Sequence, residues 1–191
     1  MGSKQIQGLL KGEKSILKNY KYTDKEVEQL ASSMVILVDT REKNISHILD
    51  SFDKNHISYE RKALNYGDYS FYIPKDESLS LQRDLFFDRE VVIERKASLE
   101  EISGNLTKER DRFEKELCLA PKEKVLLLEN ANYADIATGN YKTQYNKKSF
   151  LASIHTFWFR YHTPIFFMPD NKYSALFIKK YFEYYLKEQL R

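Results

Sequence analysis

Three acidic side chains stand where predicted strands end or turn. They are Asp39, Asp68 and Glu94; the first and third follow short apolar runs, and the second lies in a turn. Functional groups of an α/β sheet collect where strands give way to loops, so we expect these carboxylates to share one pocket. Their ionised forms would repel one another unless a cation neutralised them. The pattern therefore predicts a cation site built from carboxylate oxygens.

Lys96 lies two residues after Glu94, and alternate residues of an extended strand share a face. Hard oxygen ligands without His or Cys suit Mg²⁺ or Mn²⁺. Such an ion lowers the pKa of a bound water and polarises a phosphoryl oxygen, while Lys96 can orient that water or stabilise charge on the phosphate. We therefore predict metal-assisted phosphodiester hydrolysis, with Asp39, Asp68 and Glu94 as metal ligands. Each short pattern alone has a plainer interpretation, because acids at strand ends commonly cap helices or bind water.

The elements that must position these residues alternate between strand and helix. Apolar or alternating runs predict strands at residues 34–38, 57–63, 69–73, 91–93, 125–128 and 164–168. Apolar residues at helical spacing predict helices at residues 45–52, 98–117 (interrupted at 104–105), 149–161 and 171–190. The second and third strands flank a turn and read as a hairpin, so the sheet is not purely parallel. The fold class is α/β, with a mixed central sheet flanked by helices.

Length and composition fit one folded domain. The chain has 191 residues with 42% hydrophobic content, which excludes global disorder. Residues 1–33 are predicted to be a polar N-terminal tail with one short helix, which a Thr23–Glu26 capping box begins; residues 34–191 form the domain. The sequence shows no membrane-spanning run or secretory signal, and the single Cys118 excludes an intrachain disulfide.

The net charge of +3 conceals an uneven distribution. Residues 34–141 carry a net charge of −5, whereas residues 142–191 carry +6. The basic segment is also rich in aromatic residues, a combination that can bind nucleic acid through phosphate contacts and base stacking. The candidate phosphate contacts are Lys142, Lys147, Lys148 and Arg160. Most aromatic residues of this segment are expected in the core, and exposed ones on the last helix could form a dimer interface.

Three motifs in order resemble a known family. Residues 38–42, 67–69 and 93–96, which read VDTRE, GDY and IERK, are similar to the signatures of XPF-type structure-specific DNA endonucleases of the PD-(D/E)XK superfamily. The resemblance covers roughly residues 34–185 and implies a restriction-endonuclease-like fold. It implies that Asp39, Asp68 and Glu94 hold the metal and that Lys96 acts on the water or phosphate.

The resemblance also implies roles for other charged residues. Glu42 would support the acidic site, and Arg41 and Arg95 would bind DNA phosphate or brace the acids. XPF-type nuclease domains pair through their C-terminal helices, so the expected homodimer interface consists of Phe177, Tyr181, Tyr184 and Tyr185.

The chain departs from the family pattern in two places. The family has Asp four residues after the Lys, and this chain has Glu100; the interpretations are a catalytic acid or an acid favoured in the first turn of a helix. Eukaryotic and archaeal members usually carry a tandem helix-hairpin-helix module after the nuclease, which this sequence lacks. We therefore expect a stand-alone form, encoded by a bacterium or a phage and cytoplasmic.

Three functions follow as hypotheses. The first is a Mg²⁺- or Mn²⁺-dependent endonuclease acting on branched, flap or fork DNA in repair, recombination or replication, with no small-molecule cofactor and no membrane partner. The second is a catalytically silent module with a nuclease fold that binds DNA or a partner. The third is a Holliday-junction resolvase using the same metal chemistry.

Overall fold

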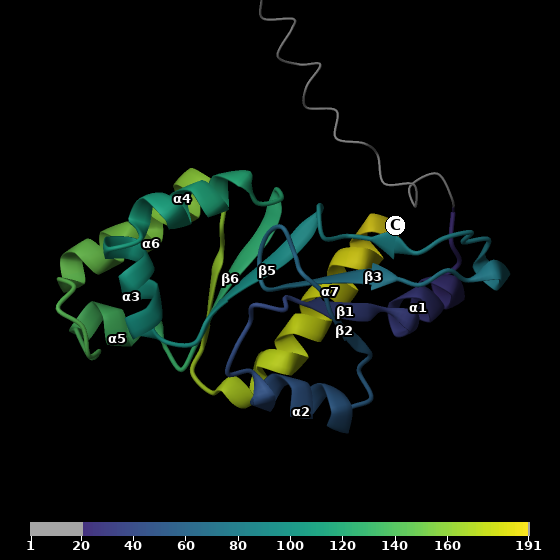
Figure 1. Cartoon of the computed structure of the whole chain (residues 1–191), viewed down its shortest axis with the longest axis horizontal. Helices are drawn as coiled ribbons and strands as arrows, with labels where there is room; N and C mark the ends of the chain where they lie inside the picture. The colour runs from purple at the N-terminus through teal and green to yellow at the C-terminus, as the bar shows by residue number, and fades with distance from the viewer. Residues whose placement is uncertain (1–20, 191) are drawn as a thin grey trace, which may run out of the picture.

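The computed structural model describes residues 21–190. A central sheet separates two groups of helices (Figure 1). The strands are β1 (Val35–Val38), β2 (Tyr59–Arg61), β3 (Tyr69–Ile73), β4 (Leu85–Phe86), β5 (Val91–Lys96), β6 (Glu123–Glu129) and β7 (Ile165–Met168). The helices are α1 (Asp24–Ser33), α2 (Ser46–Lys54), α3 (Leu99–Thr107), α4 (Arg110–Leu119), α5 (Tyr133–Thr138), α6 (Lys147–Tyr161) and α7 (Ser174–Leu190), with short 3₁₀ helices η2 (Glu77–Leu79) and η3 (Asn171–Tyr173).

The sheet is mixed, which confirms the predicted class. Its order is β2-β1-β3-β5-β6-β7, with β4 paired to β3. Strand β3 runs antiparallel to β1, β4 and β5, whereas the pairs β1–β2, β5–β6 and β6–β7 are parallel. The predicted hairpin of the second and third strands is wrong, because β1 lies between β2 and β3. The buried β1 thereby satisfies its backbone hydrogen bonds on both sides.

Each face of the sheet has its own apolar core. Helices α1, α2 and α7 pack on one face, and α3, α4, α5 and α6 pack on the other. Helix α1 begins at the predicted capping box of Thr23 and Glu26, which is confirmed. Its residues Val27, Leu30 and Ala31 are buried in the first core, and Lys179 of α7 donates to the Ala31 carbonyl at 2.9 Å. The helix at residues 24–33 is therefore packed against the sheet domain, and residues 1–20 of the predicted tail lie outside the described residues.

Two helix predictions need correction. Helix α3 continues through Gly104 and Asn105, and the break falls at Lys108 and Glu109. A glycine costs a helix only about 1 kcal/mol relative to alanine, which the buried residues of α3 offset. The six-residue α5 was not predicted; a capping box of Asn132 and Asp135 begins it.

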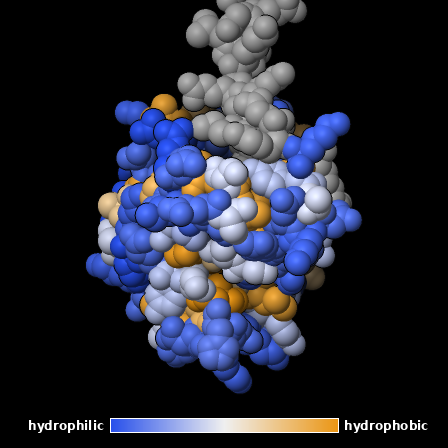
Figure 2. Space-filling view, turned by 90° about the vertical axis from the view of Figure 1, so that its right-hand side faces the viewer, coloured by the Kyte–Doolittle hydropathy of each residue, from blue (hydrophilic) through white to orange (hydrophobic). Residues whose placement is uncertain are grey.

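One end of the molecule has a largely polar surface. Figure 2 shows the end of the molecule at the right of Figure 1, where hydrophilic side chains dominate and hydrophobic ones lie in small separate patches. Across residues 21–190, no helix is long and apolar enough to cross a lipid bilayer.

Candidate active site

Strand β5 sends its consecutive charged side chains to opposite faces of the sheet. Glu94 and Lys96 face α4, where the Lys96 ammonium lies 5.3 Å from the Phe113 ring centre. Lys96 Nζ donates to Glu94 Oε1 at 2.7 Å. The period of two in an extended strand places this pair together, as the sequence predicted.

The turn before β3 places Asp68 against the same strand. The Asp68 amide donates to the Ile93 carbonyl, and the Arg95 amide donates to Asp68 Oδ2 at 2.7 Å. Gly67 makes this close approach possible: its φ is +66°, and a Cβ there would lie 2.8 Å from Val92 Cβ. A residue with a side chain would meet both the strained backbone and the clash.

Asp68, Glu94 and Lys96 line one cavity of about 260 Å³ beside α4. Arg41 also lines it, as do residues that the motifs did not predict: Tyr66, Arg112, Glu116, Lys124 and Thr163. Most of these carried no local motif. Lys124 carried a weak signal, because it shares the period-two register of the buried Leu126 and Leu128 in the same strand.

The predicted ligand Asp39 is directed elsewhere. Its carboxylate accepts hydrogen bonds from the Arg41 amide, the Arg41 guanidinium and the Leu64 amide, all within 2.9 Å. Burial would raise the pKa of the Asp39 carboxyl, but these hydrogen bonds hold it below its ordinary value. The Asp39 amide donates to the Asp68 carbonyl at 2.8 Å, so Asp39 contacts the site through its backbone.

Among the acids that line the cavity, Asp68 is the one whose carboxyl pKa is changed most by its surroundings. Burial raises the pKa of the Asp68 carboxyl well above its ordinary value, and the charges of Glu94 and Glu42 raise it further. Burial would lower the pKa of the Lys96 amine, but Glu94 and Asp68 raise it above its ordinary value. The ammonium therefore offsets part of the negative charge, and the Asp68 carboxyl still holds its proton more tightly than an exposed aspartic acid does.

The fit to a divalent ion rests on two carboxylates. Asp68 and Glu94 line the cavity, and hard carboxylate oxygens are the ligands that Mg²⁺ and Mn²⁺ favour. Within residues 21–190, no three His, Cys, Asp or Glu side chains are grouped as a metal site. Asp39 does not present free oxygens in this arrangement, because backbone and guanidinium N–H groups bind both of them.

Arg95 is buried and forms ion pairs with two acidic residues. Its guanidinium is 4% exposed and binds Glu42 at 3.1 Å and Glu129 at 2.7 Å. His47 Nε2 in turn lies 3.0 Å from Glu129 Oε1. These contacts favour the implied role of Arg95 in bracing the acids, and the alternative of a DNA-phosphate contact stays a prediction. Glu129 was not predicted, although a carboxylate directly after four apolar strand residues is itself a signal.

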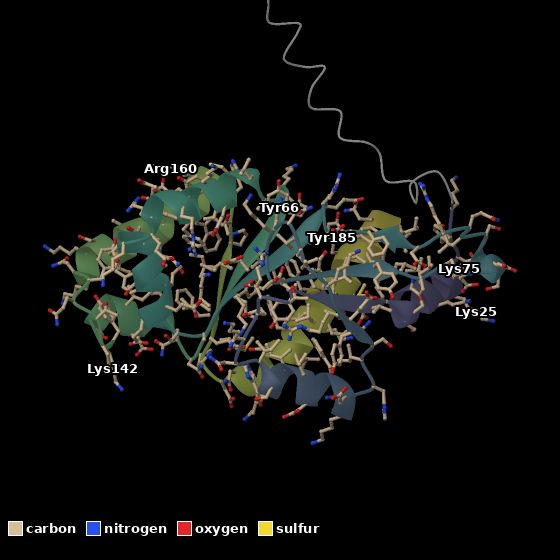
Figure 3. All side chains as sticks on the ribbon, in the orientation of Figure 1. Lys25, Tyr66, Lys75, Lys142, Arg160 and Tyr185 are labelled. Atoms are coloured by element: carbon tan, nitrogen blue, oxygen red, sulfur yellow. The ribbon has the colours of Figure 1, made fainter. Side chains whose placement is uncertain are left out.

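The basic candidates of the C-terminal segment do not line the cavity. Figure 3 shows Lys142 and Arg160 at opposite edges of the half of the molecule that contains α3 to α6. The Lys142 amide donates to Glu100 Oε1 at 3.0 Å, and Arg160 lies 3.8 Å from Glu114. Lys147 and Lys148 begin α6 and are exposed. A role for these four in binding DNA stays a prediction.

Glu100 and Glu101 differ in their surroundings. Glu100 contacts the Lys142 backbone, whereas Glu101 Oε1 lies 3.8 Å from Lys96 Nζ. Of these two acids, the one nearer Lys96 is thus one position later than the family pattern places it.

The predicted dimer residues form one aromatic surface on α7. Phe177 and Tyr181 stack with ring centres 5.8 Å apart, and Tyr184 is 60% exposed. Together with Tyr185, Lys180 and Glu188 they line a shallow groove.

Comparison with known proteins defines the class. The ERCC4 domain family matches residues 38–181, most of the chain. The chain therefore belongs to the ERCC4 domain family, and its fold is that of an XPF-type nuclease domain, as the three motifs predicted.

Two solved structures share the fold. XPF from Aeropyrum pernix is 17% identical with a TM-score of 0.56, and the match covers 79% of this chain and 64% of that one. XPF from Aeropyrum pernix in complex with DNA is 18% identical with a TM-score of 0.58, covering 81% and 66% respectively. This chain thus spans slightly less than two thirds of each. No curated protein matches it significantly by sequence.

Proposed function

We propose that this chain is a divalent-metal-dependent endonuclease that hydrolyses phosphodiester bonds in branched, flap or fork DNA. The observation that carries the proposal is the shared cavity of Asp68, Glu94 and Lys96. Membership of the ERCC4 domain family supports it, and one structure of the same fold has DNA bound. Repair, recombination and replication are the processes that produce such DNA structures.

The metal would be Mg²⁺ or Mn²⁺, held by Asp68 and Glu94. When bound, this ion supplies an acidified water and a positive charge for the phosphoryl oxygens. Asp39 holds the loop of Asp68 in place through Arg41 and Leu64. Glu42 and Arg95 brace β5 from the opposite face, which keeps Glu94 directed into the cavity.

Lys96 has a separate role in the proposed reaction. Its raised pKa keeps it protonated at neutral pH, so it acts as a hydrogen-bond donor and a positive charge. It can hold the attacking water or stabilise charge that develops on the scissile phosphate. Loss of one such donor typically lowers a rate by about 10²- to 10³-fold.

The direct test uses labelled flap, fork and linear duplexes with Mg²⁺ or Mn²⁺. We expect cleavage of one strand of a branched substrate by wild type and its loss in Asp68→Ala and Glu94→Ala. Glu77→Ala is the matched control, because this exposed acid does not line the cavity. If wild type cuts none of these substrates, or if both site variants cut as well as wild type, the chain is not this enzyme.

Other outcomes identify the alternatives. Tight DNA binding without cleavage in either metal would identify a catalytically silent module. Paired symmetric nicks in a four-way junction would identify a Holliday-junction resolvase. The cytoplasmic location and the bacterial or phage origin stay predictions.

We also propose a homodimer that pairs through α7. The groove of Phe177, Tyr181, Tyr184 and Tyr185 supports this proposal, because aromatic residues are enriched where protein interfaces form. A C₂ pairing would place the same groove of each subunit against the other.

A further inference from the structure

Lys124 stands on the same face of the sheet as the proposed catalytic residues. It pairs in register with Val92, while Glu94 pairs with Leu126 on the same neighbouring strand. Strand spacing places the Lys124 backbone roughly 8 Å from that of Glu94. Its side chain lines the same cavity as Asp68 and Glu94.

This lysine is a buried cation that forms no ion pair among the described residues, although Glu123 lies near enough to offset part of the lowering that burial imposes on the pKa of its amine. It is 8% exposed, and its one hydrogen bond runs from Nζ to the Pro121 carbonyl at 3.1 Å. The other cations that line the cavity each have a carboxylate partner: Arg41 with Asp39, Lys96 with Glu94, and Arg112 with Glu109 and Glu116. Among the residues that the structure describes, no carboxylate lies within ion-pair distance of Lys124.

Such a group is costly unless something compensates it. Lysines are almost never buried without a partner, and burial lowers the pKa of the Lys124 amine. An ammonium has three N–H donors, and the Pro121 carbonyl occupies one. The remaining donors can bind an anion that enters the cavity, which would supply the missing charge.

We infer that Lys124 binds a backbone phosphate of the DNA strand, close to the phosphate that is cut at Asp68 and Glu94. This inference rests on the proposed function and adds a phosphate subsite to it. Asp68, Glu94 and Lys124 line one cavity, and Leu117 and Val92 give it an apolar wall that a sugar ring can contact. In a DNA strand, the phosphate that is cut is followed by a sugar and then by the next phosphate. The sugar can therefore lie against the apolar wall while the next phosphate reaches Lys124.

The first test compares Lys124→Met with Lys122→Met. Lys122 precedes it by two residues and its side chain is 93% exposed, so it controls for the loss of one positive charge. We expect Lys124→Met to weaken binding of a flap duplex by about 10- to 100-fold, the range for a hydrogen bond to a charged group. Lys122→Met should change it less than about threefold.

Folding gives a second, opposite readout. Replacing an unpaired buried charge by an apolar side chain should leave the thermal midpoint unchanged or raise it. A weaker-binding variant that is at least as stable as wild type cannot owe its defect to unfolding. Lys124→Gln provides the same test if the Met variant does not fold.

The second test locates the contact. Flap substrates carry a single uncharged methylphosphonate at successive positions around the cut. One position should weaken wild-type binding and add nothing further in Lys124→Met, because the contact is already lost. Equal losses in both proteins at every position would overturn the inference, as would wild-type affinity of the Lys124 variants.

The outcomes separate the two proposals. If wild type cuts DNA and the Lys124 variants bind and cut normally, only the phosphate subsite is wrong. If wild type binds DNA with Lys124-dependent affinity and cuts nothing, only the proposed enzyme is wrong. A wild type that neither binds nor cuts DNA overturns both.

Discussion

Arg95 and Lys96 are consecutive in β5, and their charged ends lie on opposite faces of the sheet. Lys96 binds Glu94 in the cavity at 2.7 Å, whereas Arg95 binds Glu129 at 2.7 Å beneath it. Backbone partners on β6 show the same division: Leu127, opposite Arg95, belongs to one core, and Leu128, opposite Lys96, belongs to the other. A single strand thus presents the proposed catalytic pair, Glu94 and Lys96, on one face and the buried ion pair of Arg95 on the other.

The buried ion pair of Arg95 and Glu129 predicts how substitutions in it change the free energy of unfolding. Glu129 is fully buried, so Glu129→Ala removes one of the two carboxylates that neutralise Arg95. Breaking such a pair costs about 3–5 kcal/mol, which chemical denaturation would measure as a lower free energy of unfolding. The triple variant Arg95→Met, Glu129→Leu and Glu42→Leu should cost less than Glu129→Ala alone, because none of the three charges remains.

The exposed pair of Lys122 and Glu123 is the control for this comparison. Their side chains are 93% and 53% exposed, and exposed pairs contribute about 1 kcal/mol or less. Glu123→Ala should therefore be nearly neutral. A Glu129→Ala variant as stable as Glu123→Ala would show that the buried network does not anchor β5.

Asp68 predicts a dependence of stability on pH and metal. Its folded pKa is raised by burial and by Glu94 and Glu42. The folded state therefore holds this proton more tightly than the unfolded state, and stability falls as pH rises from the ordinary Asp pKa through the raised value. Asp68→Asn, which cannot ionise, should exceed wild type in metal-free unfolding free energy at pH 8 by about 1–3 kcal/mol. The gap should close near pH 4.

The buried charge of Asp68 lowers the stability of the folded state, whereas a bound metal ion should raise it. Ligands that bind only the folded state stabilise it, so excess Mg²⁺ or Mn²⁺ should raise the thermal midpoint of wild type more than that of Asp68→Asn. Equal shifts in the two proteins would mean that Asp68 does not hold the ion. Metal-free unfolding curves that coincide at pH 8 would mean that its buried charge is not costly.

Much of the fold could be predicted because its buried elements have simple patterns. Strands β1, β5 and β6 are short apolar runs, and α7 has apolar residues at helical spacing. Strand order could not be read in the same way. Residues 57–63 and 69–73 have the pattern of a hairpin, and nothing in either segment shows that β1 pairs with both. That arrangement depends on α2 returning the chain parallel to β1, which is a tertiary property.

The candidate site likewise has a part that could be predicted from the sequence and a part that depends on tertiary structure. The motifs contain Asp68, Glu94 and Lys96. Strand periodicity alone places Glu94 and Lys96 on the same face. The resemblance offered a brace for the acids as one role of Arg41, but the motifs did not show that the Leu64 amide binds the Asp39 carboxylate, since Leu64 is 25 residues away along the chain. Lys124 likewise enters the cavity through its pairing with β5.

The aromatic surface of α7 predicts a concentration-dependent dimer. Tyr184→Glu would place a charge in the proposed interface, whereas Tyr173→Glu alters a similarly exposed tyrosine outside the groove; the two are 60% and 51% exposed. Sedimentation velocity should show a dimer for wild type and Tyr173→Glu and a monomer for Tyr184→Glu. Thermal midpoints measured at a concentration where all three are monomeric should agree, since exposed substitutions change stability by about 0.5 kcal/mol or less. A wild type that stays monomeric throughout would contradict the pairing.

Gly67 predicts that the position of Asp68 is set by one close contact. Gly67→Ala meets two penalties: a left-handed backbone at φ +66° and a Cβ 2.8 Å from Val92 Cβ. Gly139→Ala is the matched control, because its φ is +85° but its Cβ would meet nothing nearer than 3.8 Å. The control should cost about 1–2 kcal/mol from backbone strain alone. Gly67→Ala should cost more and should also lower cleavage, because the turn must move and carry Asp68 with it. Adding Val92→Gly removes both the Cβ at 2.8 Å and the methyl group at 3.1 Å, so it should restore part of the cleavage in Gly67→Ala. If both glycine variants lose equal stability and cut equally well, the close contact with β5 does not position the acid.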